Sequence, residues 1–167
     1  MSGTGRDDGF EEAFDQLFPR AVRLAHKLLG DRAGAEDVAA EALARAYARW
    51  SKVGGLPYRD GWVLKVATNL CIDRMRRRVP DVSPGTAGDF EDAVDLRLAL
   101  NAALVRLAPR QRQAITLHYL GGLSDREVAQ ALGISLGSVK THIHRGLKTL
   151  RAGLGSGLQE VVPVAVD

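Results

Sequence analysis

The sequence predicts an all-α protein of two small helical domains joined by an acidic flexible linker, the second being a helix-turn-helix domain. Three observations support this prediction. Apolar residues recur every three or four positions along most of the 167 residues, and strand-like alternation is absent. Between residues 79 and 95 the composition changes to proline, glycine and acidic residues. Residues 123–150 have the spacing of two short helices that meet at a tight corner.

The first domain is expected to contain three helices. Pro19 should interrupt or kink the first helix, and Gly30 should end it. Asp31 is expected to cap a second helix that runs to about Trp50, and a third helix should occupy residues 60–78. Their helical spacing predicts a buried face that includes Val38, Ala39, Ala42, Leu43, Ala46, Trp62, Val63, Val66, Ala67, Leu70 and Met75. The single cysteine, Cys71, lies on this face and is expected to be buried.

The linker contains five acidic residues and no basic residue, a composition typical of a flexible connection. Pro109 suits the first position of a helix in the second domain. The predicted boundaries are a disordered N-terminus at 1–9, the first domain at 10–78, the linker at 79–95, the second domain at 96–152 and a flexible tail at 153–167.

The helix-turn-helix prediction depends on caps and on one glycine. Ser124 and Ser135 can cap the two helices, and Gly133 provides the positive φ that turns the chain between them. The second helix has an apolar stripe made by Leu136, Val139, Ile143, Leu147 and Leu150. It has no acidic residue within 136–154, so it can approach DNA phosphates without repulsion. The competing interpretation is a helical bundle with a solvated basic face.

The third helix of the first domain is also cationic. Residues 59–78 contain six basic and two acidic side chains, with the aromatic residues Trp50, Tyr58 and Trp62 nearby. A solvated helix end with favourable dipole interactions explains this charge without a ligand. A groove that follows a single DNA strand explains it equally well. Two DNA-contacting domains on one tether would touch two separated DNA segments.

Enzymatic chemistry finds little support. Of the four histidines, His142 and His144 are two residues apart and therefore lie on different sides of a helix. There is no phosphate-binding glycine loop and no serine or cysteine nucleophile with a plausible base. We expect no catalytic residue, no metal and no cofactor. Because the N-terminus lacks a signal-peptide core and no apolar run could span a bilayer, we expect a soluble, cytoplasmic protein without membrane insertion.

These features together resemble the extracytoplasmic-function (ECF) group of bacterial RNA polymerase sigma factors, which retain only the region-two and region-four domains of larger sigma proteins. The resemblance covers roughly residues 10–151. It is carried by three segments: GDRAGAEDVAAEALARAYARW resembles the helix that docks on the polymerase β′ clamp, WVLKVATNLCIDRMRRR the −10 reader, and LAPRQRQAITLHYLGGLSDREVAQALGISLGSVKTHIHRGLKTLR the −35 reader.

The resemblance implies a function, partners and site residues. The chain would bind core RNA polymerase through the β′ clamp and β flap, direct it to promoter DNA, and have an anti-sigma factor as a further partner. Polymerase docking is implied for Glu36, Asp37, Glu41, Leu43 and Arg45. Recognition of the −10 element is implied for Lys65, Asn69, Arg74, Arg76 and Arg77, with the loop 51–58 holding a flipped base. Recognition of the −35 element is implied for Arg112, Ser138, Lys140, Thr141, His142, His144, Arg145 and Lys148.

The chain also departs from the family pattern. Ala40 stands where many members have glutamine, and His118 and His142 stand where arginine is frequent, so promoter preference cannot be carried over from a typical member. The string VKTHIHR additionally resembles the helix-turn-helix of LuxR-type regulators. The alternative is therefore a stand-alone transcriptional regulator that binds duplex DNA as a dimer.

Overall fold

The computed structural model describes residues 9–78 and 93–154, and within these ranges it is helical with no strand. The first half contains α1 (Phe10–Leu29), α2 (Arg32–Ala48), the short α3 (Trp50–Val53) and α4 (Arg59–Arg78). The second half contains α5 (Ala93–Arg106), α6 (Pro109–Ile115), the π-helical turn η1 (Thr116–Leu120), α7 (Asp125–Leu132) and α8 (Leu136–Leu154). The all-α prediction is confirmed. The predicted N-terminal disorder, most of the predicted linker and most of the tail lie outside the described residues.

Helix α1 runs through Pro19, so the predicted interruption at this residue is wrong, while the kink predicted as the other possibility stays a prediction. Proline in a helix interior costs about 3 kcal/mol, whereas each fully buried leucine stabilises the fold by about 2 kcal/mol. The face of α1 that packs on α2 and α4 buries several such residues: Ala13, Leu17, Ala21, Leu24, Ala25, Leu28 and Leu29. Burial of this face therefore outweighs the backbone bond lost at Pro19. The helix ends at Gly30, as predicted, with a φ of 75°.

Helix α2 begins as the sequence predicts and ends slightly earlier. The Asp31 side chain accepts a hydrogen bond of 2.6 Å from the Gly34 N–H, which caps the helix. The helix ends at Ala48, and Trp50 begins α3 instead of ending α2. Four fully buried alanines lie on one face, which lets α1 and α4 approach closely; they are Ala35, Ala39, Ala42 and Ala46.

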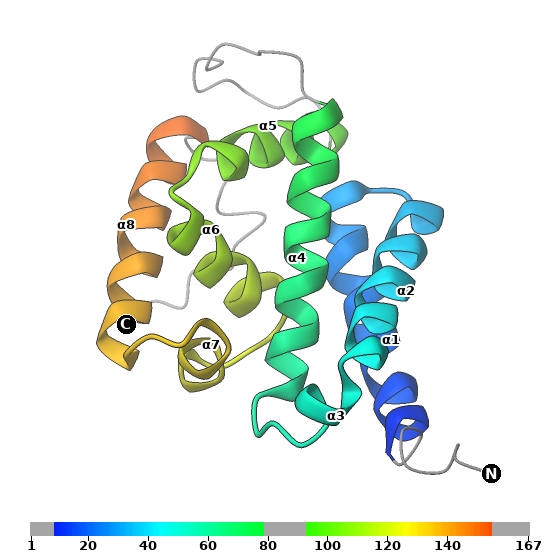
Figure 1. Ribbon diagram of the computed structural model, residues 1–167. Coiled ribbons are helices and arrows are strands. Elements are labelled where there is room, and N and C mark those ends of the chain that lie inside the picture. Colours follow the sequence, from blue (N-terminus) through cyan, green and yellow to red (C-terminus); the bar gives the residue numbers. More distant parts are fainter. Residues whose placement is uncertain (1–8, 79–92, 155–167) are drawn as a thin grey trace, which may run out of the picture.

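Helix α4 lies at the centre of the molecule, with α1 and α2 on one side and α5 to α8 on the other (Figure 1). Buried residues of both halves form one continuous core. The buried Asn101 of α5 donates a hydrogen bond of 2.7 Å to the carbonyl of Leu28, at the end of α1. Cys71 of α4 is fully buried as predicted, and burial raises the pKa of its thiol to about 12. The two halves are thus packed together in this structure.

Candidate nucleic-acid and docking surfaces

The helix-turn-helix corner is built as the sequence predicts. The Ser124 Oγ accepts a bond of 3.2 Å from the Glu127 N–H, and the Glu127 carboxylate accepts one of 2.8 Å from the Ser124 N–H. These hydrogen bonds lower the pKa of Glu127, since they favour the charged carboxylate. Gly133 has a φ of 64° at the end of α7, and the Ser138 N–H donates to the Ser135 Oγ at 3.1 Å. The corner therefore fixes α8 against α7.

Helix α8 presents a polar face and buries an apolar one. Val139, Ile143, Leu147 and Leu150 are buried, whereas Leu136 is 41% exposed, so its predicted place in the buried stripe is wrong. Helix α8 packs against α5, α6 and α7, and Leu136 is its first residue. Most of the −35 candidates on α8 are exposed, namely Lys140, Thr141, His144, Arg145 and Lys148, while Ser138 and His142 are half-buried. The structure brings these seven side chains onto one helix.

Arg112 does not belong to that surface. Its side chain is buried, and its guanidinium donates to the carbonyls of Val105 and Leu107 at 3.0 Å and of Leu104 at 3.5 Å. These carbonyls end α5, where backbone acceptors lack helical partners. In this structure Arg112 therefore holds the end of α5 against α6, which does not support the −35 contact implied for it.

The −10 candidates on α4 divide into three groups. The Lys65 ammonium donates a bond of 3.2 Å to the Ala131 carbonyl, and Asn69 accepts one of 3.3 Å from Gln113, so both face the second half. Arg74 faces α2, where it donates to the Gly34 carbonyl at 3.2 Å and lies 3.9 Å from Asp37. Arg76 and Arg77 are exposed. The structure therefore does not bring the five candidates onto one face.

The loop before α4 forms a small polar hollow of about 230 Å³. It is lined by Leu56, Pro57, Tyr58, Arg59, Asp60, Gly61 and Glu127. Arg59 lies over the Trp50 ring at 5.7 Å, and Arg20 pairs with Asp60 at 2.9 Å. Sequence reasoning placed the base-holding loop at 51–58, but residues 51–53 belong to α3 and the hollow extends to residue 61. The contribution of Glu127 was missed, because it comes from the other half of the chain.

A larger groove of about 620 Å³ lies between α2 and α4. Its charged lining residues are Asp37, Glu41, Arg45, Asp73, Arg74 and Arg77. Arg45 pairs with Glu41 at 2.8 Å across one helical turn. Leu43 is 1% exposed, so the docking contact implied for it is corrected: its side chain belongs to the core. Three implied docking residues, Asp37, Glu41 and Arg45, thus meet in one groove.

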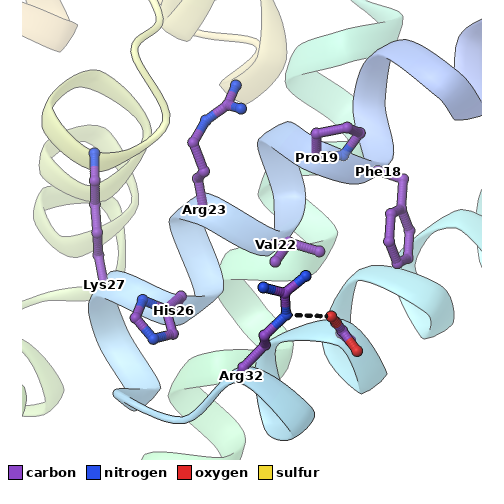
Figure 2. Close-up of a pocket in the computed structure, with 8 residues that line it drawn as sticks. Phe18, Pro19, Val22, Arg23, His26, Lys27 and Arg32 are labelled. Carbon is purple, nitrogen blue, oxygen red and sulfur yellow. Dashed lines mark hydrogen bonds and ion pairs between the residues drawn. The ribbon is translucent and has the colours of Figure 1, made fainter.

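Glu36 lines a second groove, of about 510 Å³, between α1 and α2 (Figure 2). There it pairs with Arg32 at 2.8 Å. The rest of the lining is apolar or basic: Phe18, Pro19, Val22, Arg23, His26 and Lys27. Figure 2 shows the side chains of Arg23 and Lys27 directed away from Arg32. The structure therefore separates Glu36 from the other docking candidates.

The described residues contain no group of three or more histidine, cysteine, aspartate or glutamate side chains placed to hold a metal ion. His118 Nδ1 lies 3.2 Å from the Asp125 carboxylate, and the Tyr119 ring packs against the His118 ring. Both contacts of this histidine are therefore with nearby residues of the second half. None of the helices in the described ranges is long and apolar enough to cross a membrane.

Two family descriptions match the two halves of the chain, in the order of the sequence. The family description Sigma-70 region 2 matches residues 13–79, and Sigma-70 region 4 matches residues 97–150. The ECF RNA polymerase sigma factor SigW of Bacillus subtilis (strain 168) is 33% identical over 170 residues, covering 90% of this chain and 91% of that protein. The RNA polymerase sigma-E factor of Streptomyces coelicolor is 32% identical over 151 residues, covering 87% and 85%.

Two solved structures share the fold. CnrH, in complex with the cytosolic domain of CnrY, has a TM-score of 0.59 at 22% identity and covers 89% of each chain. The sigma factor RpoE in complex with the anti-sigma factor NepR, from Bartonella quintana, has a TM-score of 0.54 at 22% identity, covering 96% of this chain and 99% of that one.

Proposed function

The chain belongs to the ECF group of RNA polymerase sigma factors, and on that premise we propose how its surfaces divide promoter recognition. It is a DNA-binding initiation factor that binds core RNA polymerase and directs it to promoters through their −10 and −35 elements. The observation that carries this conclusion is the match of region 2 and region 4, in order, to the two halves of one chain. A stand-alone regulator is not favoured, because a helix-turn-helix regulator would not account for the first half of the chain, which matches region 2.

The −35 element is assigned to the polar face of α8. Lys140, Arg145 and Lys148 are exposed cations on a helix without acidic side chains, and such residues contact phosphates. The same helix carries polar side chains that can reach base edges in the major groove, namely Ser138, Thr141, His142 and His144. Phosphate contacts then set affinity and salt dependence, while the residues near the start of α8 choose the sequence.

The −10 element is assigned to α4 and to the loop before it. Lys65, Asn69, Arg76 and Arg77 follow one another along α4, and the polar hollow at residues 56–61 adjoins the start of that helix. A cationic helix follows the backbone of an unpaired strand, and a hollow beside it can hold an extruded base. Arg74 is assigned instead to the groove between α2 and α4, because it already contacts both Gly34 and Asp37.

Polymerase docking is assigned to the groove between α2 and α4. Asp37 and Glu41 are exposed carboxylates on α2, and Arg45 and Arg74 place cations beside them. A groove with both signs of charge fixes the orientation of a partner by electrostatic complementarity. Phosphodiester chemistry then belongs to polymerase, and the chain acts where polymerase does, in the cytoplasm. Since structural relatives are bound to CnrY and to an anti-sigma factor, we also assign an anti-sigma partner to this chain.

Run-off transcription with purified bacterial core polymerase tests the proposal, with start sites then sequenced from a genomic library. We expect discrete starts that require both the chain and the core enzyme. A matched pair of variants locates the docking groove: Asp37→Lys should abolish co-elution with core polymerase, whereas Glu36→Lys, in the groove between α1 and α2, should retain it. A footprint on an inverted repeat in the absence of polymerase would instead support a dimeric regulator.

A further inference from the structure

Gly61 of α4 and Ala131 of α7 bring the two halves into close contact. A Cβ added at Gly61 would lie 2.7 Å from the Ala131 Cβ, and 3.6 Å from a methyl group of Leu123. Both Gly61 and Ala131 are buried. Backbones approach this closely only where the facing side chains are small. The contact between α4 and α7 is therefore shaped by residues from distant parts of the sequence.

The same face of α4 continues with Lys65 and Asn69, one and two turns beyond Gly61. The Lys65 ammonium donates to the Ala131 carbonyl, and the neighbouring Leu132 carbonyl accepts a bond of 3.2 Å from Arg110. These carbonyls end α7, where the helix carries partial negative charge. Burial and nearby Arg110 lower the pKa of Lys65, in keeping with an ammonium withdrawn from water. The Ala131 carbonyl at the end of α7 thus accepts a hydrogen bond that the Lys65 ammonium could otherwise donate to a DNA phosphate.

Helix α7 also contributes to the lining of the hollow beside α4. Glu127 contributes to its lining, and the pKa of this carboxyl is lowered by its bonds to Ser124, so it is ionised at neutral pH. A carboxylate at that position repels the phosphates of an entering strand. By contrast, Lys140, Arg145 and Lys148 on α8 are exposed.

Resting on the −10 assignment above, we propose that α7 and a single DNA strand compete for one face of α4. The chain without polymerase is then closed at its −10 reader and open at its −35 reader. Engagement of the opened strand requires α7 to leave Gly61 and Lys65, and Gln113 of α6 to release Asn69. This makes the interface between α4 and α7 a second, intramolecular binding mode of the −10 surface, and it limits capture of unpaired DNA by the free chain.

Substitution at Ala131 tests the competition. Ala131→Leu keeps helix propensity but places a larger side chain against Gly61, so α4 and α7 must part. Gln130→Leu is the matched control, because it adds the same side chain at an exposed neighbouring position. The first measurement is acetylation of the Lys65 amine, followed by mass spectrometry with exposed Lys52 as internal reference. We expect Lys65 to react several-fold faster in Ala131→Leu and at the wild-type rate in Gln130→Leu.

The second measurement is binding of a fluorescein-labelled single strand, taken from the non-template −10 region of a mapped promoter, by the full chain without polymerase. Because apparent affinity scales with the populated open fraction, Ala131→Leu should bind about tenfold more tightly. Duplex −35 binding should not change. Equal Lys65 reactivity and equal strand affinity in wild type and Ala131→Leu would overturn the proposal.

A failure of run-off transcription by the wild type would instead refute the proposed function, while Lys65 reactivity would still report closure. If circular dichroism shows that Ala131→Leu does not fold, Gln113→Ala provides the test. It removes the bond to Asn69 and should produce a smaller gain in strand affinity. No gain from Gln113→Ala in that case would also refute the competition.

Discussion

Helices α4 and α8 each carry a cationic polar face, but the two faces differ in how the fold uses them. The face of α8 is open, since its apolar side packs on α6 and its amino end is fixed by Ser135. The face of α4 is partly covered, because Lys65 and Asn69 bond to the second half. On the assignments proposed above, the surface that would read duplex DNA is displayed, whereas the surface that would read unpaired DNA already has contacts within the chain.

The largest expected effect distinguishes a buried arginine that supports the second half from an exposed arginine on the polar face of α8. Arg112→Met should lower the free energy of unfolding by about 3 kcal/mol, because the carbonyls of Leu104, Val105 and Leu107 lose a buried charged donor. Arg145→Met, at an exposed position on α8, should change it by less than about 0.5 kcal/mol. Urea denaturation of both variants measures the difference. Wild-type stability of Arg112→Met together with weakened −35 binding would instead support the DNA contact that the sequence implied for Arg112.

The helix caps could be predicted from the sequence, whereas the buried position of Arg112 could not. Local signals placed the caps at Asp31, Ser124 and Ser135 and the turn at Gly133, because each depends on neighbours within a few residues. Arg112 was expected at the surface because a cationic side chain is normally solvated, and the three carbonyls that it satisfies become visible only once α5 packs on α6.

Residues distant in sequence explain the other differences. Leu43 and Glu36 are both on α2, but Leu43 is buried in the core and Glu36 lines the groove between α1 and α2. The packing of α1 and α4 on α2 determines both positions, as it determines which residues line the groove between α2 and α4. Nothing near Gly61 or Ala131 in the sequence signals that they meet, because a small side chain is compatible with many environments. The fold class and the recognition helix were therefore predictable, while the covered state of α4 was not.

The second prediction tests whether α4 reads unpaired DNA. Asn69→Ala should reduce promoter opening about tenfold, since a polar contact to a base is worth about 1.4 kcal/mol, and leave duplex −35 binding unchanged. Permanganate reactivity of unpaired thymines, with the holoenzyme bound, measures opening. A mobility shift with the isolated −35 duplex is the control. Losses of equal size in the two assays would contradict the division of labour between α4 and α8.

The third prediction concerns the exposed charge on α8. Lys140→Ala should lower the slope of log affinity against log salt by about 0.9 for the −35 duplex, as expected for one lost phosphate contact. Lys52→Ala removes the same charge from an exposed position in the first half and should leave that slope unchanged. Fluorescence anisotropy at four salt concentrations is sufficient. An unchanged slope in Lys140→Ala would remove this lysine from the phosphate-binding set.

The smallest expected effect concerns α7, the element shared by both readers. Since hydrogen bonds hold the pKa of Glu127 below its ordinary value of 4.5, the charged carboxylate stabilises the fold at neutral pH. That contribution is present above pH 4.5 and is lost as the pH falls through the lowered pKa. Glu127→Gln lacks this titration. The wild type should therefore exceed the variant by less than about 0.5 kcal/mol at pH 6, because the side chain is exposed, and this advantage should shrink as the pH is lowered to 3.

Denaturant unfolding of wild type and Glu127→Gln at the two pH values measures this difference. A stability difference that is the same at both would show that the carboxylate charge does not support the cap. Because Glu127 both caps α7 and faces the hollow beside α4, the variant also weakens the repulsion of an entering strand. Its affinity for the single −10 strand should rise slightly while duplex −35 binding holds. On the competition proposed above, the residue that caps α7 would then also limit access to the −10 surface.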